Sequence, residues 1–203
     1  MERLVKRLMN RRRFITTVSF ASAINLFWRH SLASPSNVID DLSLPAPLAT
    51  NGASWELIAD QVMGGVSQGT MRRETVAGRP AIRMRGDVSL ENNGGFLQIA
   101  LDLRPDGKGL DANDRQGLEI DAYGNGEEYN LHLRTADVTR PWQSYRQSFI
   151  ASPEWKTFRL NFEDFKPHRI ETPLDLTTLR RIGIVAIGRA FSADIAIGGV
   201  RFC

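Results

Sequence analysis

Residues 97–103 read Leu-Gln-Ile-Ala-Leu-Asp-Leu, with a large apolar side chain at every second position. Because successive side chains of a β-strand point to opposite faces, this alternation is typical of a strand with one buried and one solvated face. Turn-forming Gly, Asp, Asn and Pro residues separate such segments, and the best candidate for a short helix is 174–181. The sequence therefore predicts an all-β fold of antiparallel strands, arranged as a β-sandwich or jelly roll. The same period-two pattern recurs in residues 82–85, 118–122, 129–134, 158–163 and 195–197.

Two signatures with a Gly-Gly pair stand out, at residues 60–67 and 91–96. Glycine permits positive φ and a close approach of neighbouring backbone, so both stretches are predicted to be shaped turns rather than flexible linkers. Neither contains a recognisable set of catalytic groups, which favours a binding role over an enzymatic one. The candidate partner-binding residues in these signatures are Asp60, Gln61, Met63, Gly64, Gly65, Ser67, Asn92, Asn93, Gly94, Gly95 and Phe96.

Aromatic and cationic residues form a second group of candidates. Trp142, Tyr145 and Phe149 follow Arg140, and Arg134 precedes them. Such a row can stack on a sugar or a peptide. Aromatic residues at this spacing also cover one end of a sandwich, so both interpretations stay open. Arg134, Trp142 and Tyr145 are included as candidate partner-binding residues.

The first 33 residues match an export signal. Arg11 and Arg12, one variable residue and Phe14 fit the twin-arginine pattern, and an apolar stretch runs to Trp28. Small residues then predict cleavage after Ala33. The start of the signal is either Met1 or Met9. The alternative is an organellar transit peptide, which is also rich in Arg and Ser, so the expected location is extracytoplasmic or, failing that, mitochondrial.

Charge separates this leader from the rest of the chain. Residues 1–33 hold seven of the 26 Lys and Arg and one of the 23 acids. Subtraction leaves 19 basic and 22 acidic residues, so the formal net charge of +3 becomes −3 for residues 34–203. A protein that binds nucleic acid is expected to be basic, so no nucleic-acid partner is predicted. The apolar stretch is also shorter than the roughly 20 residues that cross a bilayer, so no membrane span is predicted in the mature form.

The body of the chain divides into two parts. Residues 34–54 contain three prolines with several Ser, Ala and Asn, and they are predicted to be a linker with a short ordered piece at 38–39. Residues 55–203 are predicted to be one sandwich domain, which is long enough to bury a core of its own. Cys203 is the single cysteine, so an internal disulfide is excluded.

Enzymatic and metal chemistry find little support. Residues 65–69 match the nucleophile-elbow pattern around Ser67, but that motif requires a following helix and a parallel sheet, which are not predicted here. His132 and His168 lack the spacing of a zinc site and are expected to be ordinary surface residues. Residues 124–126 read as a hairpin turn rather than a phosphate loop. No catalytic residue, metal or cofactor is therefore predicted.

With these motifs in view, the chain resembles the family of the thirty-kilodalton complex I intermediate-associated protein, over about residues 55–202. The resemblance implies a galactose-binding-domain-like β-sandwich. It also implies a non-enzymatic role, since mitochondrial relatives help to assemble the membrane arm of respiratory complex I. Three positions depart from the family pattern: Asn125 stands where an acid is expected, Asn161 where proline is common, and Ala190 where glycine usually precedes Phe191. The matching residues are 60–67, 93–96, 117–118, 124–129, Tyr145, Phe149, Trp155, 161–165 and 182–184.

Two functions follow as hypotheses. The first is an assembly module that holds a protein partner, such as subunits of a membrane respiratory complex, with the face around the two glycine signatures. The second is an extracytoplasmic carbohydrate-binding module that uses Trp142, Tyr145, Asn92 and Asn93. Stable protein partners would favour the first hypothesis, and retention on glycans would favour the second.

Replacing Arg11 and Arg12 by lysine should leave the precursor in the cytoplasm. Lysine keeps the charge but lacks the planar guanidinium, and the translocase reads the arginine pair itself. Immunoblots of cytoplasmic and extracytoplasmic fractions measure the outcome, with Arg13→Lys, at the variable position of the motif, as the control. Normal export of the double variant would contradict the twin-arginine interpretation. An N-terminus far from Ser34 in the mature protein would correct the cleavage site.

Overall fold

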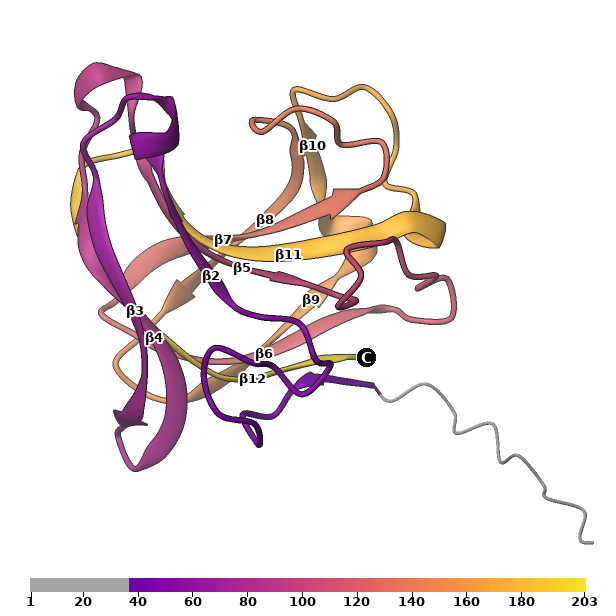
Figure 1. Ribbon diagram of the computed structural model, residues 1–203, viewed down its shortest axis with the longest axis horizontal. Coiled ribbons are helices and arrows are strands. Elements are labelled where there is room, and N and C mark those ends of the chain that lie inside the picture. The colour runs from indigo at the N-terminus through magenta and orange to yellow at the C-terminus, as the bar shows by residue number, and fades with distance from the viewer. Residues whose placement is uncertain (1–36) are drawn as a thin grey trace, which may run out of the picture. The chain divides into compact units, whose positions relative to one another are not determined.

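Two antiparallel β-sheets face each other across a shared hydrophobic core (Figure 1). The computed structural model describes residues 37–203, and the predicted signal with Arg11, Arg12, Phe14 and Ala33 lies outside them. The all-β sandwich predicted from the alternation is confirmed. The first sheet has the order β3(Gln68–Val76), β4(Arg79–Val88), β12(Phe191–Phe202), β6(Gly117–Gly124), β9(Lys156–Asn161), with β1(Val38–Asp40) also paired to β12. The second sheet has the order β10(Lys166–His168), β8(Ser144–Ala151), β7(Glu127–Thr135), β11(Leu179–Ile187), β5(Phe96–Asp102), β2(Glu56–Ala59). Short 3-10 helices lie at η1(Asp60–Met63), η2(Glu91–Asn93), η3(Phe162–Asp164) and η4(Leu176–Thr178).

The core is built from the apolar positions of the alternating strands. Leu97, Ile99 and Leu101 of β5 are fully buried. Gln98 and Asp102 of the same strand are half-buried on its opposite face. This alternation leaves the outer face of the second sheet free to carry polar groups.

The stretch predicted as a linker belongs to the sandwich from Asn37 onward. Val38–Asp40 pairs with β12, and Ile39 is buried in the core. The buried Asp40 carboxylate accepts a hydrogen bond from the indole N–H of Trp55 at 2.7 Å. The content of Pro, Ser and Ala is typical of a linker. A strand of three residues and one buried carboxylate are nevertheless enough to hold this segment on the domain. The ordered piece expected at 38–39 is present.

The helix considered for 174–181 is not formed. Only Leu176–Thr178 makes a 3-10 turn, and β11 begins at Leu179. Asp175 caps the turn by accepting a hydrogen bond from the backbone N–H of Thr177 at 2.9 Å. A local cap and a few apolar residues imitate the start of a longer helix.

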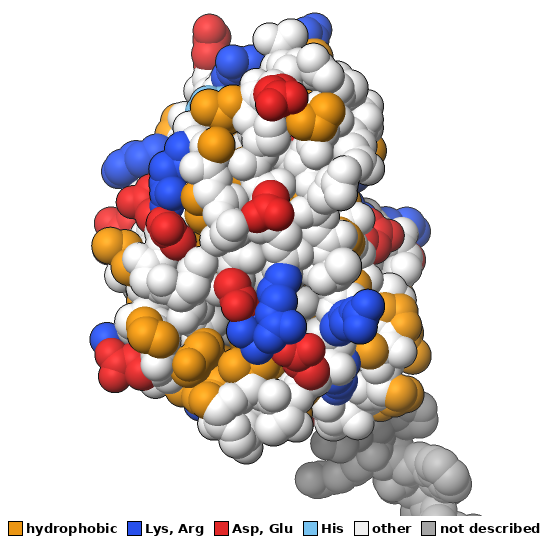
Figure 2. Space-filling view, turned by 90° about the vertical axis from the view of Figure 1, so that its left-hand side faces the viewer, with side chains coloured by type: hydrophobic (Ala, Val, Ile, Leu, Met, Phe, Trp, Pro, Cys, Tyr) orange, Lys and Arg blue, Asp and Glu red, His pale blue; other side chains and the backbone are white. Residues whose placement is uncertain are grey.

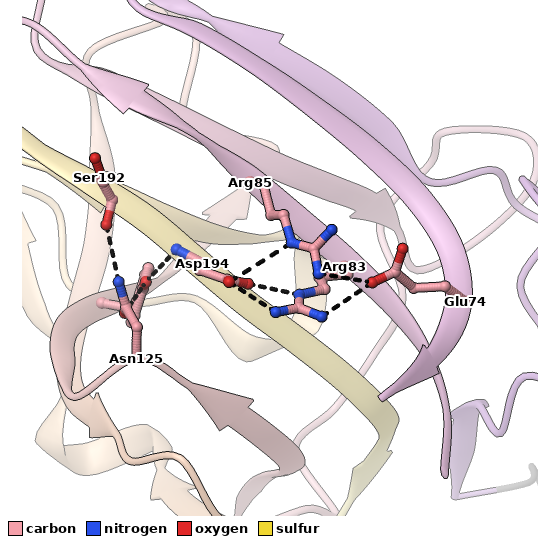
Figure 3. Close-up of polar contacts among 7 residues, drawn as sticks. Glu74, Arg83, Arg85, Asn125, Ser192 and Asp194 are labelled. Carbon is pink, nitrogen blue, oxygen red and sulfur yellow. Dashed lines mark hydrogen bonds and ion pairs between the residues drawn. The ribbon is translucent and has the colours of Figure 1, made fainter. Parts of the chain in front are cut away.

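Charges on the outer face of the first sheet compensate one another. The Arg83 guanidinium donates two hydrogen bonds to Asp194, at 2.6 and 2.7 Å, and one to Glu74 at 3.0 Å (Figure 3). Arg85 pairs with the same two acids, at 3.1 and 3.5 Å. Basic and acidic side chains accordingly lie next to each other over β3 and β4 (Figure 2).

A polar link at Tyr129 joins the two sheets. The Tyr129 hydroxyl, on β7, accepts a hydrogen bond from the backbone N–H of Asp194, on β12, at 2.9 Å. It donates to Oδ1 of Asn125 at 2.7 Å, and Nδ2 of Asn125 donates to the Ser192 carbonyl at 2.8 Å (Figure 3). Burial is the main cause that raises the pKa of Tyr129 to about 12, so the hydroxyl keeps its proton at neutral pH. Asn125 therefore acts as both donor and acceptor, which an acid at this position could not do.

Asn125→Asp should lower the free energy of unfolding by about 1–2 kcal/mol, because the donor to Ser192 is lost and a carboxylate faces a carbonyl oxygen. Urea denaturation at pH 7 measures the change. Asn113→Asp, at an exposed position, makes the same change of charge and serves as the control. Equal stability of the two variants would contradict the role given to the Asn125 amide.

Candidate functional site

The carboxylate of Asp60 joins the two glycine signatures. Asp60 is fully buried, and Ser67 donates to it through the backbone N–H at 3.0 Å and the hydroxyl at 2.5 Å. From the second signature, the N–H of Gly95 donates at 2.6 Å and that of Phe96 at 3.3 Å. Burial opposes ionisation, but these hydrogen bonds outweigh it and hold the pKa of Asp60 below its usual value. The two signatures therefore form one structural unit.

Both reasons for glycine occur within this unit. Gly64 has a φ of 91°, in the left-handed region that other residues rarely adopt. Gly65 instead lies against Asp60, because an added Cβ would be 2.4 Å from the aspartate Cγ. At Gly94 an added Cβ would be 2.5 Å from Oδ2 of the same carboxylate. The packing around Asp60 thus requires glycine on both sides.

A groove of about 400 Å³ lies on the outer face of the second sheet. Its floor is formed by β5, β7 and β11, with contributions from β2, β8 and β10. Figure 1 shows η1 and η2 at one end of this curved sheet and the loops around β10 at the other. The groove is thus bounded by segments that are distant in the sequence.

The end of the groove beside η1 and η2 is apolar. Val62, Met63 and Leu90 line it and are 72%, 48% and 53% exposed. Phe96 and Ile187, from neighbouring strands, extend the apolar lining. Several large apolar side chains exposed around one concave surface are characteristic of an interaction site.

Trp142 lies on the opposite side of the groove. Its ring is 44% exposed, and its loop is held by Arg134, which donates to three carbonyls of residues 138–141 at 3.2–3.4 Å. The Gln143 amide donates to the Arg169 carbonyl at 3.0 Å, which ties this loop to the segment after β10. The tryptophan ring is therefore presented on a supported loop.

The floor between these ends carries histidine and arginine. His132 is 8% exposed and lies directly across from Arg146 of β8. Burial, followed by the positive charges of Arg146, His168 and Arg134, lowers the pKa of His132 to about 3. His132 is therefore neutral at pH 7, and the positive charge of the floor comes from guanidinium groups.

The groove brings together six of the sequence-predicted candidates. Four of them come from the glycine signatures, and the other two come from the group of aromatic and cationic residues. These six residues are Met63, Gly94, Gly95, Phe96, Arg134 and Trp142.

Three other candidates are corrected because their side chains are buried. Asp60 and Ser67 are fully buried and bond to each other, so neither offers its side chain to a partner. Tyr145 is 1% exposed, and its hydroxyl donates to the carbonyls of Thr172 and Pro173 at 2.8 and 3.0 Å. Of the two interpretations of the aromatic row, the core applies to Tyr145 and the surface to Trp142.

The remaining candidates lie outside the groove. Gln61 lines a separate depression beside η1, Gly64 is exposed at the end of that turn, and Gly65 is buried against Asp60. Asn92 and Asn93 are exposed, with φ of 54° and 58°. Asparagine tolerates this left-handed backbone, so these two residues shape the turn.

Sequence reasoning missed most of the floor. His132 and His168 were expected to be ordinary surface residues, but both line the groove, and His132 is buried. Arg146, Arg169 and Arg181 also line it. The sequence does show polar residues at alternating positions of these strands. Recognising that they form one surface would have required the strand order, which the sequence does not give.

The nucleophile-elbow pattern is a coincidence of spacing. The Ser67 hydroxyl donates to Asp60 and accepts from the backbone N–H of Ser89 at 2.9 Å, and strand β3 follows it where the motif needs a helix. Within residues 37–203, no three His, Cys, Asp or Glu residues gather in a group that could hold a metal ion. Over the same residues, the structure contains no helix with the length and apolar character needed to cross a membrane.

Comparisons with known proteins agree with this architecture. The family described as Complex I intermediate-associated protein 30 (CIA30) matches residues 48–196. A comparison with curated proteins found no match.

Among solved structures, the family 11 carbohydrate-binding module of the cellulosomal cellulase Lic26A-Cel5E of Clostridium thermocellum is similar. Its TM-score is 0.65 at 13% identity, over 84% of this chain and 95% of that one. The Clostridium thermocellum module in complex with a beta-1,3-1,4-mixed-linked tetrasaccharide gives 0.64 at 13% identity, over 82% and 94%. A family 30 carbohydrate-binding module gives 0.53 at 14% identity, over 71% and 80%. At these identities, the likeness establishes a shared jelly-roll sandwich.

Asp60→Asn should lower the free energy of unfolding by about 2–4 kcal/mol at pH 7, because an amide presents a donor to groups that themselves donate. The folded pKa is below the unfolded value of about 3.9, so the contribution of the carboxylate is complete above that pH. It is lost as the pH falls through the folded pKa, and the difference between the two proteins should shrink there. Denaturation between pH 7 and acid measures both effects.

Glu91→Gln is the matched control, because it neutralises an exposed acid in the second signature. The role given to Asp60 is rejected if both variants unfold at the same denaturant concentration at pH 7.

Proposed function

This chain belongs to the family of complex I intermediate-associated protein 30, and on that basis we propose that it is a non-enzymatic binding module that holds a protein partner in its groove. The observation that carries the proposal is the exposure of Trp142 together with Val62, Met63 and Leu90 around one concave surface. Tryptophan is among the residues that most often supply the binding energy of protein interfaces, and exposed apolar side chains gathered around one surface mark interaction sites.

The family description points to the kind of partner. Its name associates the family with intermediates of complex I, so the proposed partner is a subunit or intermediate of a membrane respiratory complex. We also propose that the chain acts outside the cytoplasm after twin-arginine export. The leader is the ground for that location, and organellar import is its alternative.

Carbohydrate binding is the second candidate function. Trp142 presents a half-exposed ring beside a groove, and a flat aromatic surface can stack on a sugar. The shared fold with carbohydrate-binding modules makes this candidate worth testing. The apolar end of the groove favours the protein partner, because Val62 and Leu90 have no polar group to offer a sugar hydroxyl.

Trp142→Ala should reduce recovery of the partner about tenfold or more without changing the melting temperature, since the ring is half-exposed and its loop is held by Arg134. Crosslinking and affinity purification of the tagged full-length protein from its own cells, with identification by mass spectrometry, measure recovery. The control is Ile150→Ala, which removes an exposed apolar side chain outside the groove.

Glycan arrays probed with the same two variants separate the candidates. Retention on a glycan that Trp142→Ala abolishes, with no crosslinked protein, would replace the assembly role by carbohydrate binding. Equal recovery of protein partners by both variants would show that the groove is not the binding surface.

A further inference from the structure

The groove concentrates positive charge that the chain itself does not neutralise. Four arginines line it, and Arg181 pairs with Asp102, whose oxygens accept at 2.5 and 3.1 Å, and with Glu56 at 3.3 Å. Among the described residues, no acid forms an ion pair with Arg134, Arg146 or Arg169, and no acid lines the groove.

The side-chain hydrogen bonds of Arg134 and Arg146 are with neutral groups. Arg134 bonds to backbone carbonyls, and Nε of Arg146 donates to the Ser144 hydroxyl at 2.8 Å. Arg169 is exposed with a φ of 54°, a left-handed conformation that is costly for a residue with a side chain. Their charges therefore remain available to a ligand.

Arginines without a neighbouring acid are a feature of the groove, because arginines on the outer face of the first sheet are paired with acids. There Arg83 and Arg85 share Glu74 and Asp194, so each cation has two acids within 3.5 Å (Figure 3). The same chain thus pairs Arg83 and Arg85 with acids on one sheet and surrounds Arg134, Arg146 and Arg169 with no acid in its groove. His132 is neutral at pH 7, so the positive charge of the floor comes from the guanidinium groups.

A small cavity at the base of the groove adds a second observation. It has a volume of about 20 Å³ and is lined by Gln98, His132, Arg134 and Arg181, among others. Nε of Arg134 and Nε2 of His132 are buried there without a hydrogen-bond partner among the described residues. Buried polar atoms are almost always paired, so these two atoms show that the chain itself leaves polar groups at the base of the groove unsatisfied.

We infer that the groove binds an extended segment of a protein partner that carries a carboxylate side chain next to an apolar one. The carboxylate lies over Arg134, Arg146 and Arg169, and the apolar side chain packs against Val62, Met63 and Leu90. Guanidinium and carboxylate form charge-assisted and often bidentate hydrogen bonds, which supplies the specificity. This inference rests on the proposed function and names the chemistry of its partner.

Two other occupants fit less well. Residues 1–33 of this chain hold seven basic residues against one acid, so the arginines of the groove would repel them. An acidic polysaccharide would satisfy the arginines but would leave the three apolar residues beside η1 and η2 without an apolar counterpart. A peptide offers both kinds of group within a few residues.

Fluorescence anisotropy with labelled peptides tests the inference on the folded protein. The probe is a ten-residue peptide of alternating Glu and Leu, and the matched probe replaces every Glu by Gln. The Glu peptide should bind at least about tenfold more tightly, and its affinity should fall as NaCl rises from about 50 to 500 mM. Equal affinity of the two peptides, or no binding of the Glu peptide at about 1 mM, would overturn the inference.

Variants locate the binding on the groove. Arg146→Gln combined with Arg169→Gln should weaken the Glu peptide about tenfold or more and reduce its salt dependence. Arg159→Gln, on the outer face of the first sheet, makes the same chemical change and should leave the affinity unchanged. If the double variant binds the Glu peptide normally, the assigned site is wrong. If oligogalacturonate binds and the peptide does not, the assigned ligand class is wrong. Partner capture that depends on Trp142 without preference for the Glu peptide would leave the proposed function standing and remove only this inference.

Discussion

The groove depends on one buried carboxylate. Asp60 accepts hydrogen bonds from Ser67, Gly95 and Phe96, and in doing so fixes the two loops that carry Val62, Met63 and Leu90. A backbone N–H that finds no partner in a buried loop is costly, so an ionised carboxylate with several donors around it is a strong organiser of such a site. The position of the apolar end of the groove therefore depends on the hydrogen bonds of Asp60.

The other side of the groove is organised by arginine rather than by an acid. Arg134 holds the loop of Trp142 through backbone carbonyls, and Gln143 connects that loop to the segment that carries Arg169. Arg134 thus has two tasks, because the same guanidinium supports the loop and charges the floor. A groove built this way offers an aromatic ring, an apolar end and cations, which are the three features that the proposed binding of a protein partner uses.

Alternation along single strands was enough to predict the sandwich, because a period of two fixes which side chains of each strand face the core. It could not predict which strands are neighbours, and the floor exists only because β7 lies between β8 and β11. His132 and Arg146 are separate polar residues in the sequence and become opposite partners through that order. The family resemblance is confirmed by the match over residues 48–196.

Residue type alone also failed to separate buried from exposed polar groups. Asp60 and Tyr145 resemble binding residues in the sequence, yet one organises loops and the other closes the core. Burial of a polar side chain depends on whether donors from distant segments reach it, and Gly95 is far from Asp60 along the chain. The export signal stays a prediction, since its residues lie outside those that the structure describes.

The order of the first sheet has a consequence for synthesis of the chain. Strand β12 lies between β4 and β6 and also pairs with β1, so the ribosome makes it after all three of its neighbours. Until β12 emerges, β4 and β6 each have an unpaired edge, and apolar residues such as Met84 and Ile120 have no completed sheet around them. The first sheet therefore closes through long-range pairing in one late step, after the chain segments of its other strands have been made.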